Sequence, residues 1–171
     1  DRDSPLWFHL LLFFITLVST TFFGALLFSG GSSGTSITSM MLNGLPFAVT
    51  LMTILLSHEM GHYLAARYFG VRATLPYFIP FPTPIGTMGA VIKIKSRIND
   101  KKALLYIGAV GPIAGFTVSL AASIFGIYHS TVVKGVLSAG NDSLIYTYGD
   151  SLLILSLVKI IHGNLPAGYD I

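Results

Sequence analysis

Three long stretches of the chain are almost continuously apolar, and polar or proline-rich segments separate them. The first runs from Leu6 to Phe28, and at about 1.5 Å rise per residue it can cross the roughly 30 Å hydrocarbon core of a bilayer. The second runs from Pro46 to Tyr68, and the third from about Ala103 to Tyr128. We predict three transmembrane helices. A signal peptide is the alternative for the first stretch, but the apolar run of such a peptide is usually shorter.

The segments around these stretches indicate where the helices begin and end. Ser29 to Ser39 is a Gly/Ser/Thr segment without apolar periodicity, which predicts a loop. Asn43 is expected to cap the second helix, with Pro46 in its first turn and Gly70 as its stop. The last apolar run, Leu152 to Ile161, is too short to span a bilayer and predicts an interfacial or partly inserted helix.

Two different patterns occupy the segment between residues 71 and 102. Its first half interleaves prolines with aromatic residues, so it cannot form a regular helix and belongs at the membrane interface or folded among the helices. In the second half, within Ala90–Arg97, isoleucines alternate with lysines from Ile92 to Lys95, which is typical of a β-strand with one wet face. The predicted fold class is an all-α multi-pass membrane protein with about three spanning helices, a short interfacial helix and a small strand or hairpin here.

Composition supports a membrane protein and excludes several other classes. Of the 171 residues, 53% are apolar and 10% are charged, whereas a soluble domain carries about a quarter charged residues. The net charge of +3 is too small and too unevenly placed to predict nucleic-acid binding. The chain has no cysteine, so histidine and carboxylate side chains must hold any metal ion.

The basic residues predict an orientation. The segment 29–39 has none, and by the positive-inside rule we expect the loop 71–102 and the N-terminus, with Arg2, to face the cytoplasm. Segments 29–39 and 130–141 then face the opposite side. Attraction of the same loop to lipid headgroups is compatible with this orientation. Seven of the ten basic residues lie between the end of the second stretch and the start of the third: Arg67, Arg72, Lys93, Lys95, Arg97, Lys101 and Lys102.

The second stretch contains the sequence His58-Glu59-Met60-Gly61-His62. Residues four apart share a helix face, so both imidazoles can reach one tetrahedral metal ion with Glu59 beside the first of them. Glu59 is the only glutamate in the chain, and a charged carboxylate at membrane depth costs at least a few kcal/mol unless something retains it. We predict a metal site with His58 and His62 as ligands and Glu59 as the base that acts on water.

Polar and small residues accompany the histidine face at three- and four-residue spacings: Thr50, Thr53, Ser57 and Gly61. One hypothesis is a polar stripe turned to the interior of the helix bundle and open to water. In the alternative, the hydroxyls bond to carbonyls of their own helix and the glycine is a packing residue. The pattern favours neither.

A further motif, Gly-Pro-Ile-Ala-Gly at residues 111–115, stands near the start of the third stretch and includes a Gly-x-x-x-Gly pair that lets another helix approach closely. With the His58–His62 motif and the proline-rich, strand-containing loop, the sequence resembles the site-2 protease family of intramembrane zinc metalloproteases. That family also favours Gly before the second histidine and carries a similar Gly-Pro-small motif. The resemblance covers about Pro46 to Tyr128, in the order of the family.

The resemblance implies Zn²⁺ and hydrolysis of peptide bonds in or near transmembrane segments of membrane-protein substrates, that is, regulated intramembrane proteolysis. Zinc held by His58 and His62 would polarise the scissile carbonyl, and Glu59 would pass a proton from water to the leaving amine. The edge from Ala90 to Lys95 could hold an unwound substrate by β-augmentation, or could pair only within its own loop. The expected partners are a substrate segment and the lipid bilayer, not nucleic acid.

One departure from the family concerns the third zinc ligand, an Asp in a Leu-Asp-Gly motif on a later helix. This chain contains no Asp-Gly pair. Asp170 follows a run similar to the one before that ligand, but its spacing is short, and Asp142 and Asp150 fall in predicted exterior or interfacial positions. We therefore expect the third ligand beyond Ile171. Residues 1–171 are then a single transmembrane metalloprotease core, a fragment that is inactive alone.

The competing hypothesis is a protein without protease activity, either a membrane metal-binding or transport protein or a degenerate homologue acting as a scaffold. The presence of Glu59 argues against degeneracy, because a scaffold need not retain a buried acid. The sequence does not indicate an oligomeric state.

Overall fold

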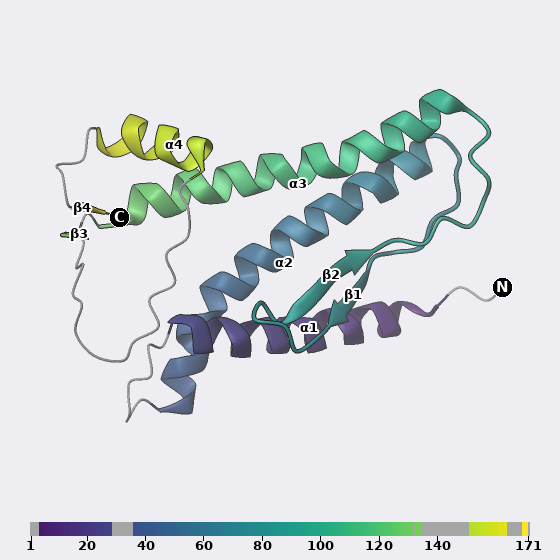
Figure 1. Ribbon diagram of the computed structural model, residues 1–171. Helices are drawn as coiled ribbons and strands as arrows, with labels where there is room; N and C mark the ends of the chain where they lie inside the picture. Colours follow the sequence, from purple (N-terminus) through teal and green to yellow (C-terminus); the bar gives the residue numbers. More distant parts are fainter. Residues whose placement is uncertain (1–3, 29–35, 132, 135–150, 164–168, 171) are drawn as a thin grey trace. The chain divides into compact units, whose positions relative to one another are not determined.

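The computed structural model describes residues 4–28, 36–131, 133–134, 151–163 and 169–170 (Figure 1). The chain divides into two compact units, residues 1–119 and 120–171. The helix of residues 101–129 includes the boundary between them. The helices are α1 (Leu6–Phe28), α2 (Ile37–Tyr68), α3 (Lys101–His129) and α4 (Leu152–His162), and the strands are β1 (Tyr77–Pro80), β2 (Thr87–Val91), β3 (Val133–Lys134) and β4 (Tyr169–Asp170).

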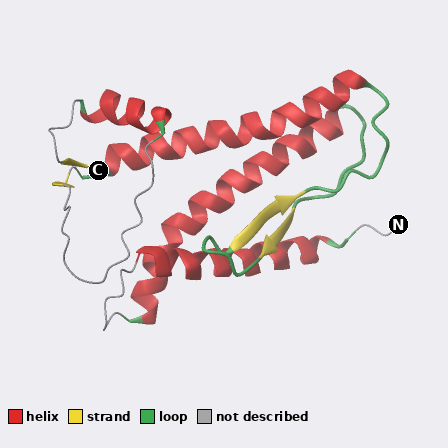
Figure 2. Cartoon of the chain, viewed as in Figure 1, coloured by secondary structure: helices red, strands yellow, loops and turns green. Residues whose placement is uncertain are grey.

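The predicted fold class is confirmed. Within the described residues, three helices are long and apolar enough to cross a membrane, namely α1, α2 and α3, while α4 is a shorter apolar helix. Figure 2 shows helix as the dominant secondary structure, with a small antiparallel sheet formed by β1 and β2. Helix α3 extends the predicted stretch by two residues at its start and one at its end, and α4 ends one residue later than expected.

The predicted start of the second helix is wrong. Helix α2 begins at Ile37 with Ser36 as its N-cap, so Asn43 and Pro46 lie inside the helix. Packing explains the difference: Gly44 is buried, and a Cβ atom there would overlap backbone of α1 at Thr21. In a membrane such close contact between small residues stabilises helix pairs, and spanning helices tolerate an internal proline. Residues 29–35 of the predicted loop lie outside the described residues.

The β-hairpin differs in position from the predicted strand. β1 pairs antiparallel with β2, with Tyr77 opposite Val91 and Phe78 opposite Ala90. The regular ladder thus ends at Val91, and the alternating isoleucines and lysines follow it, joined to the preceding segment by one isolated bridge between Ala73 and Ile94. The proline-rich half supplies the partner strand, because its aromatic and proline residues extend the backbone as a strand requires.

The hairpin lies alongside α1, as Figure 1 shows. The Ser19 hydroxyl donates a hydrogen bond of 2.8 Å to the carbonyl of Gly86 at the hairpin turn. Gly86 has a φ of 78°, and a Cβ atom there would lie 2.7 Å from the backbone of Thr20. Only glycine combines this conformation with so close an approach to the helix. On its other side the hairpin contacts α2, where Met52 packs with Phe78 and Ala90.

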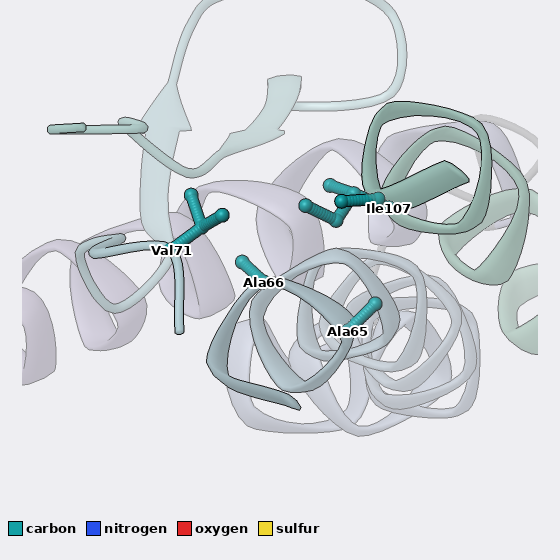
Figure 3. Close-up of a cluster of buried hydrophobic side chains, with 5 residues drawn as sticks. Ala65, Ala66, Val71 and Ile107 are labelled. Carbon is teal, nitrogen blue, oxygen red and sulfur yellow. The ribbon is translucent and has the colours of Figure 1, made fainter. Parts of the chain in front are cut away.

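A second group of buried side chains joins the end of α2 to the start of α3: Ala65, Ala66, Val71, Ala103 and Ile107. Figure 3 shows Ile107 on α3 directed toward the side chains of α2. The alanines of α2 lie one turn after the histidine motif. This cluster therefore holds α3 against the part of α2 that carries the predicted site.

In the unit of residues 120–171, Ser151 is the N-cap of α4, and its side chain accepts a hydrogen bond from the backbone N–H of Ile154. His162, at the end of α4, bonds through Nε2 to the carbonyl of Ile127 on α3 at 2.8 Å. β3 and β4 pair antiparallel, with Val133 opposite Asp170.

Candidate active site

The two histidines of α2 face one another. Their Nε2 atoms lie 3.1 Å apart, one helical turn separating the residues. Nitrogen ligands about 2.0–2.1 Å from a tetrahedral zinc ion are separated from each other by about 3.4 Å. The observed distance between His58 and His62 therefore fits two ligands of one zinc ion.

A backbone carbonyl of α3 orients the ring of His62. Its Nδ1 lies 2.6 Å from the carbonyl oxygen of Ile107, and because a carbonyl can only accept, Nδ1 carries the proton. The lone pair then resides on Nε2, the nitrogen that faces His58, as a metal ligand requires. The side chain of Ile107 belongs to the cluster that joins α2 and α3, which holds its carbonyl in place.

Three glycines allow α3 to lie directly against the histidines. A Cβ atom on Gly111 would overlap the imidazole of His62, and one on Gly115 would lie 3.1 Å from Nδ1 of His58. From the α2 side, a Cβ atom on Gly61 would lie 2.8 Å from the carbonyl of Val110. The sequence predicted a close helix contact at the 111–115 motif but not its partner. The available signal for the partner was the spacing of four residues, which separates Gly111 from Gly115 and His58 from His62 alike.

Glu59 lies on the side of α2 that faces the segment after β2. Its side chain is only 8% exposed, and its carboxylate accepts a hydrogen bond from the backbone N–H of Ile92. The backbone N–H groups of Lys93 and Lys95 instead bond toward the segment 72–74. Because successive backbone N–H groups of an extended chain point in opposite directions, Ile92 directs its own toward α2. Sequence reasoning identified Glu59 but not this contact.

A pocket of about 350 Å³ opens beside Glu59 and His62. It lies between α2, the segment after β2 and the first turns of α3, all in the unit of residues 1–119. Apart from these two residues its lining is aliphatic or glycine: Val91, Ile92, Ile94, Ile98, Leu104, Ile107 and Gly108. The carboxylate and one imidazole thus border an otherwise apolar space.

Two hydroxyls of the predicted polar stripe on α2 bond to carbonyls of their own helix, and whether the stripe is open to water stays a hypothesis. Thr53 donates to the carbonyl of Val49 at 2.7 Å, and Ser57 donates to the carbonyl of Thr53 at 2.8 Å. Gly61 is buried against α3. The bonds of Thr53 and Ser57 and the burial of Gly61 agree with the alternative account, while the exposure of Thr50 and Thr53 is compatible with a polar stripe.

The third ligand is not found among the described residues. In the described part of the chain, no group of three or more His, Asp or Glu side chains is placed to hold a metal ion. The backbone of Asp170 pairs with β3, but its side chain lies outside the description, as do Asp142 and Asp150 entirely. The other histidines, His9, His129 and His162, each bond to a backbone carbonyl.

Comparison with known proteins identifies the family. Residues 46–169 match Peptidase family M50, which is more than two thirds of the chain. The chain belongs to this family, the site-2 protease family. The match begins at Pro46, where the resemblance seen in the sequence begins, and extends beyond Tyr128 through α4.

Three curated relatives are named as probable chloroplastic zinc metalloproteases. EGY1 from Oryza sativa subsp. japonica is 36% identical over 126 residues, which cover 74% of this chain and 19% of that protein. EGY1 from Arabidopsis thaliana is 40% identical over 87 residues (51% and 16%), and EGY2 from the same plant is 35% identical over 89 residues (52% and 16%). The chain thus spans less than a fifth of the length of these relatives. No solved structure matches it.

Proposed function

We propose that this chain carries the zinc-binding and proton-transfer part of an intramembrane metalloprotease. The observation that carries the proposal is the pair of facing Nε2 atoms, 3.1 Å apart, beside a buried glutamate in a helix long enough to span a membrane. Membership in the site-2 protease family and the names of the relatives support zinc as the metal and a peptide bond as the target.

The residues around the pair have separate roles in this proposal. A bound Zn²⁺ would supply Lewis-acid polarisation of a peptide carbonyl. His62, oriented by the carbonyl of Ile107, and His58 would be its ligands. Glu59 would take a proton from the attacking water and deliver it to the leaving amine, with its carboxylate oriented by the N–H of Ile92. The aliphatic lining leaves these groups with few other polar neighbours, which lowers the local polarity and strengthens their electrostatic interactions.

The substrate is proposed to be a locally unwound segment of a membrane protein. A helix engages its own backbone amides, so the segment must open before hydrolysis and needs new hydrogen-bond partners in lipid. The hairpin offers them on the edge that borders the pocket, because β2 and its extension pair with β1 and residues 72–74 on the opposite edge. The N–H of Ile92 on the pocket edge already bonds to Glu59, so the backbone of Ile94 would supply the partners for a substrate strand. Both sequence hypotheses for this strand are thus compatible: it pairs within its own loop, and its second edge could take a substrate strand.

Removal of the two histidines tests the metal assignment. We expect each wild-type molecule to bind one zinc ion and the double variant His58→Ala/His62→Ala to bind none. Elemental analysis of purified full-length protein measures the zinc content of both. His129→Ala is a matched control, because His129 bonds to the carbonyl of Phe125 within its own helix. Zinc content that stays unchanged in the double variant would contradict the assignment.

A third protein ligand is proposed to come from outside the described residues. Catalytic zinc sites normally use three protein ligands and leave the fourth position open, whereas the described residues bring together two. Without such a third ligand, the pair of histidines is proposed to bind zinc weakly and to lack activity.

The sidedness of the loop 71–102 stays a prediction. The relatives are named as chloroplastic, so their names do not support a cytoplasmic N-terminus. What is proposed is that the loop 71–102 and the segment 29–39 lie on opposite sides of the membrane. We expect Asn99→Cys and Ser33→Cys variants to react with an impermeant thiol reagent from opposite faces of sealed vesicles. Residues 1–171 contain no cysteine, and any cysteine outside them is replaced by serine in the background used for labelling. Reaction of both variants from the same face would exclude this topology.

A further inference from the structure

The pocket beside Glu59 and His62 has the dimensions and chemistry of a side-chain subsite. Its volume of about 350 Å³ is at the lower end of the range for ligand sites, roughly 300–1,000 Å³. Apart from Glu59 and His62, no titratable side chain borders it among the described residues. A charged substrate side chain entering this space would lose its hydration without gaining a partner, whereas an apolar one would gain from burial.

Gly108 is the smallest residue in the lining, and it lies on α3 one residue after Ile107. A Cβ atom there would meet nothing within 4 Å, in contrast to Gly111 and Gly115 on the same helix, which contact the histidines. Close packing therefore does not require glycine at 108. Any larger side chain would instead reduce the space available in the pocket.

We propose that this pocket receives an apolar side chain of the substrate next to the scissile bond, and that Gly108 determines how large this side chain can be. The inference rests on the proposed protease function. It makes Gly108 a specificity-determining residue and assigns to the site substrates with a large aliphatic or aromatic residue at one fixed position.

The neighbouring strand edge explains how such a side chain would enter. Ile92 and Ile94 belong both to the edge that faces α2 and to the pocket lining. A substrate strand along this edge would direct every second side chain to the same face, so one side chain enters the pocket while its two neighbours point away. Selection would therefore apply to a single position of the substrate.

The test compares the cleavage of matched substrates by full-length wild type, Gly108→Leu and Gly126→Leu in lipid. The substrates carry Ala, Leu or Phe in turn at each position around the cleavage site. For wild type we expect kcat/KM to be highest with Leu or Phe at one position. Gly108→Leu should lower kcat/KM for those substrates relative to the Ala substrate by about 10- to 100-fold, the usual range for a filled hydrophobic pocket.

Gly126 provides the control on the same helix, because a Cβ atom there also meets nothing within 4 Å and Gly126 does not line the pocket. Gly126→Leu should retain the wild-type preference. If wild type and Gly108→Leu show the same size preference, the subsite assignment is wrong although the protease function stands. If wild type cleaves no substrate, or if Glu59→Gln cleaves as fast as wild type, the proposed function itself fails.

A binding experiment tests the same contact without turnover. Residues 1–171 contain no cysteine, so Gly108→Cys in the Glu59→Gln background, with any cysteine outside these residues replaced by serine, places a single thiol in the pocket. A substrate with a thiol-reactive group at the selected position should cross-link to it, at least 10-fold faster than to Gly126→Cys in the same background. Equal rates at the two positions would overturn the proposal even if a variant were poorly active.

Discussion

Replacing Glu59 by glutamine is expected to lower the rate of peptide-bond cleavage by about 10²–10⁴-fold, the usual contribution of a general acid–base residue. The amide is nearly isosteric with the carboxylate and can still accept the hydrogen bond from Ile92, but it cannot take a proton from water. Zinc content should stay at the wild-type level, because the ligands His58 and His62 are unchanged. Cleavage of a membrane-embedded substrate and elemental analysis of the same preparation measure both effects.

Asp100→Asn is the matched control for this loss of one carboxylate. Asp100 is exposed and accepts a hydrogen bond from the backbone N–H of Lys102 at the start of α3, where asparagine caps equally well. Its cleavage rate should stay near that of wild type. Full activity of Glu59→Gln would contradict the assignment of Glu59 as the base. The transport hypothesis would be favoured if wild type cleaves no substrate but transports metal ions, and Glu59→Gln loses this transport.

Replacing Gly111 by alanine is expected to weaken zinc binding by about 10- to 100-fold, the usual effect of disturbing the groups that orient a metal ligand. The added methyl group would overlap the imidazole of His62, so either the ring leaves its bond with the carbonyl of Ile107 or α3 moves away from α2. Cleavage should fall at least as far, because Glu59 acts on water only when the ligands are aligned. Competition with a chelator measures the affinity.

Gly126→Ala separates this effect from a general change in α3. Both substitutions raise helix propensity by up to about 1 kcal/mol, but at Gly126 the new methyl group meets nothing within 4 Å. The control should keep wild-type zinc affinity and activity. If Gly111→Ala also keeps them, His62 is not held against α3 in the way that the structure shows.

The sequence predicted the elements whose signals are local. Continuous apolar stretches located α1 and α3 to within two residues, since the length needed to cross a bilayer is a property of the segment alone. The start of α2 was misplaced because Asn43 and Pro46 are typical of a helix start, and their tolerance inside a helix depends on contacts with α1. The hairpin lies within the predicted segment 71–102, but β1 was not identified, because this proline-rich strand carries no alternating pattern of its own.

The sequence by itself determined the candidate chemistry, because four-residue spacing on one helix suffices to bring His58 and His62 together and to place Glu59 beside them. Only the tertiary structure decided how these side chains are held and what they face. The carbonyl that orients His62 belongs to a residue 45 positions away, and the N–H that contacts Glu59 comes from the strand extension after β2. Such contacts depend on how the helices and the hairpin pack, which no spacing within a single segment encodes.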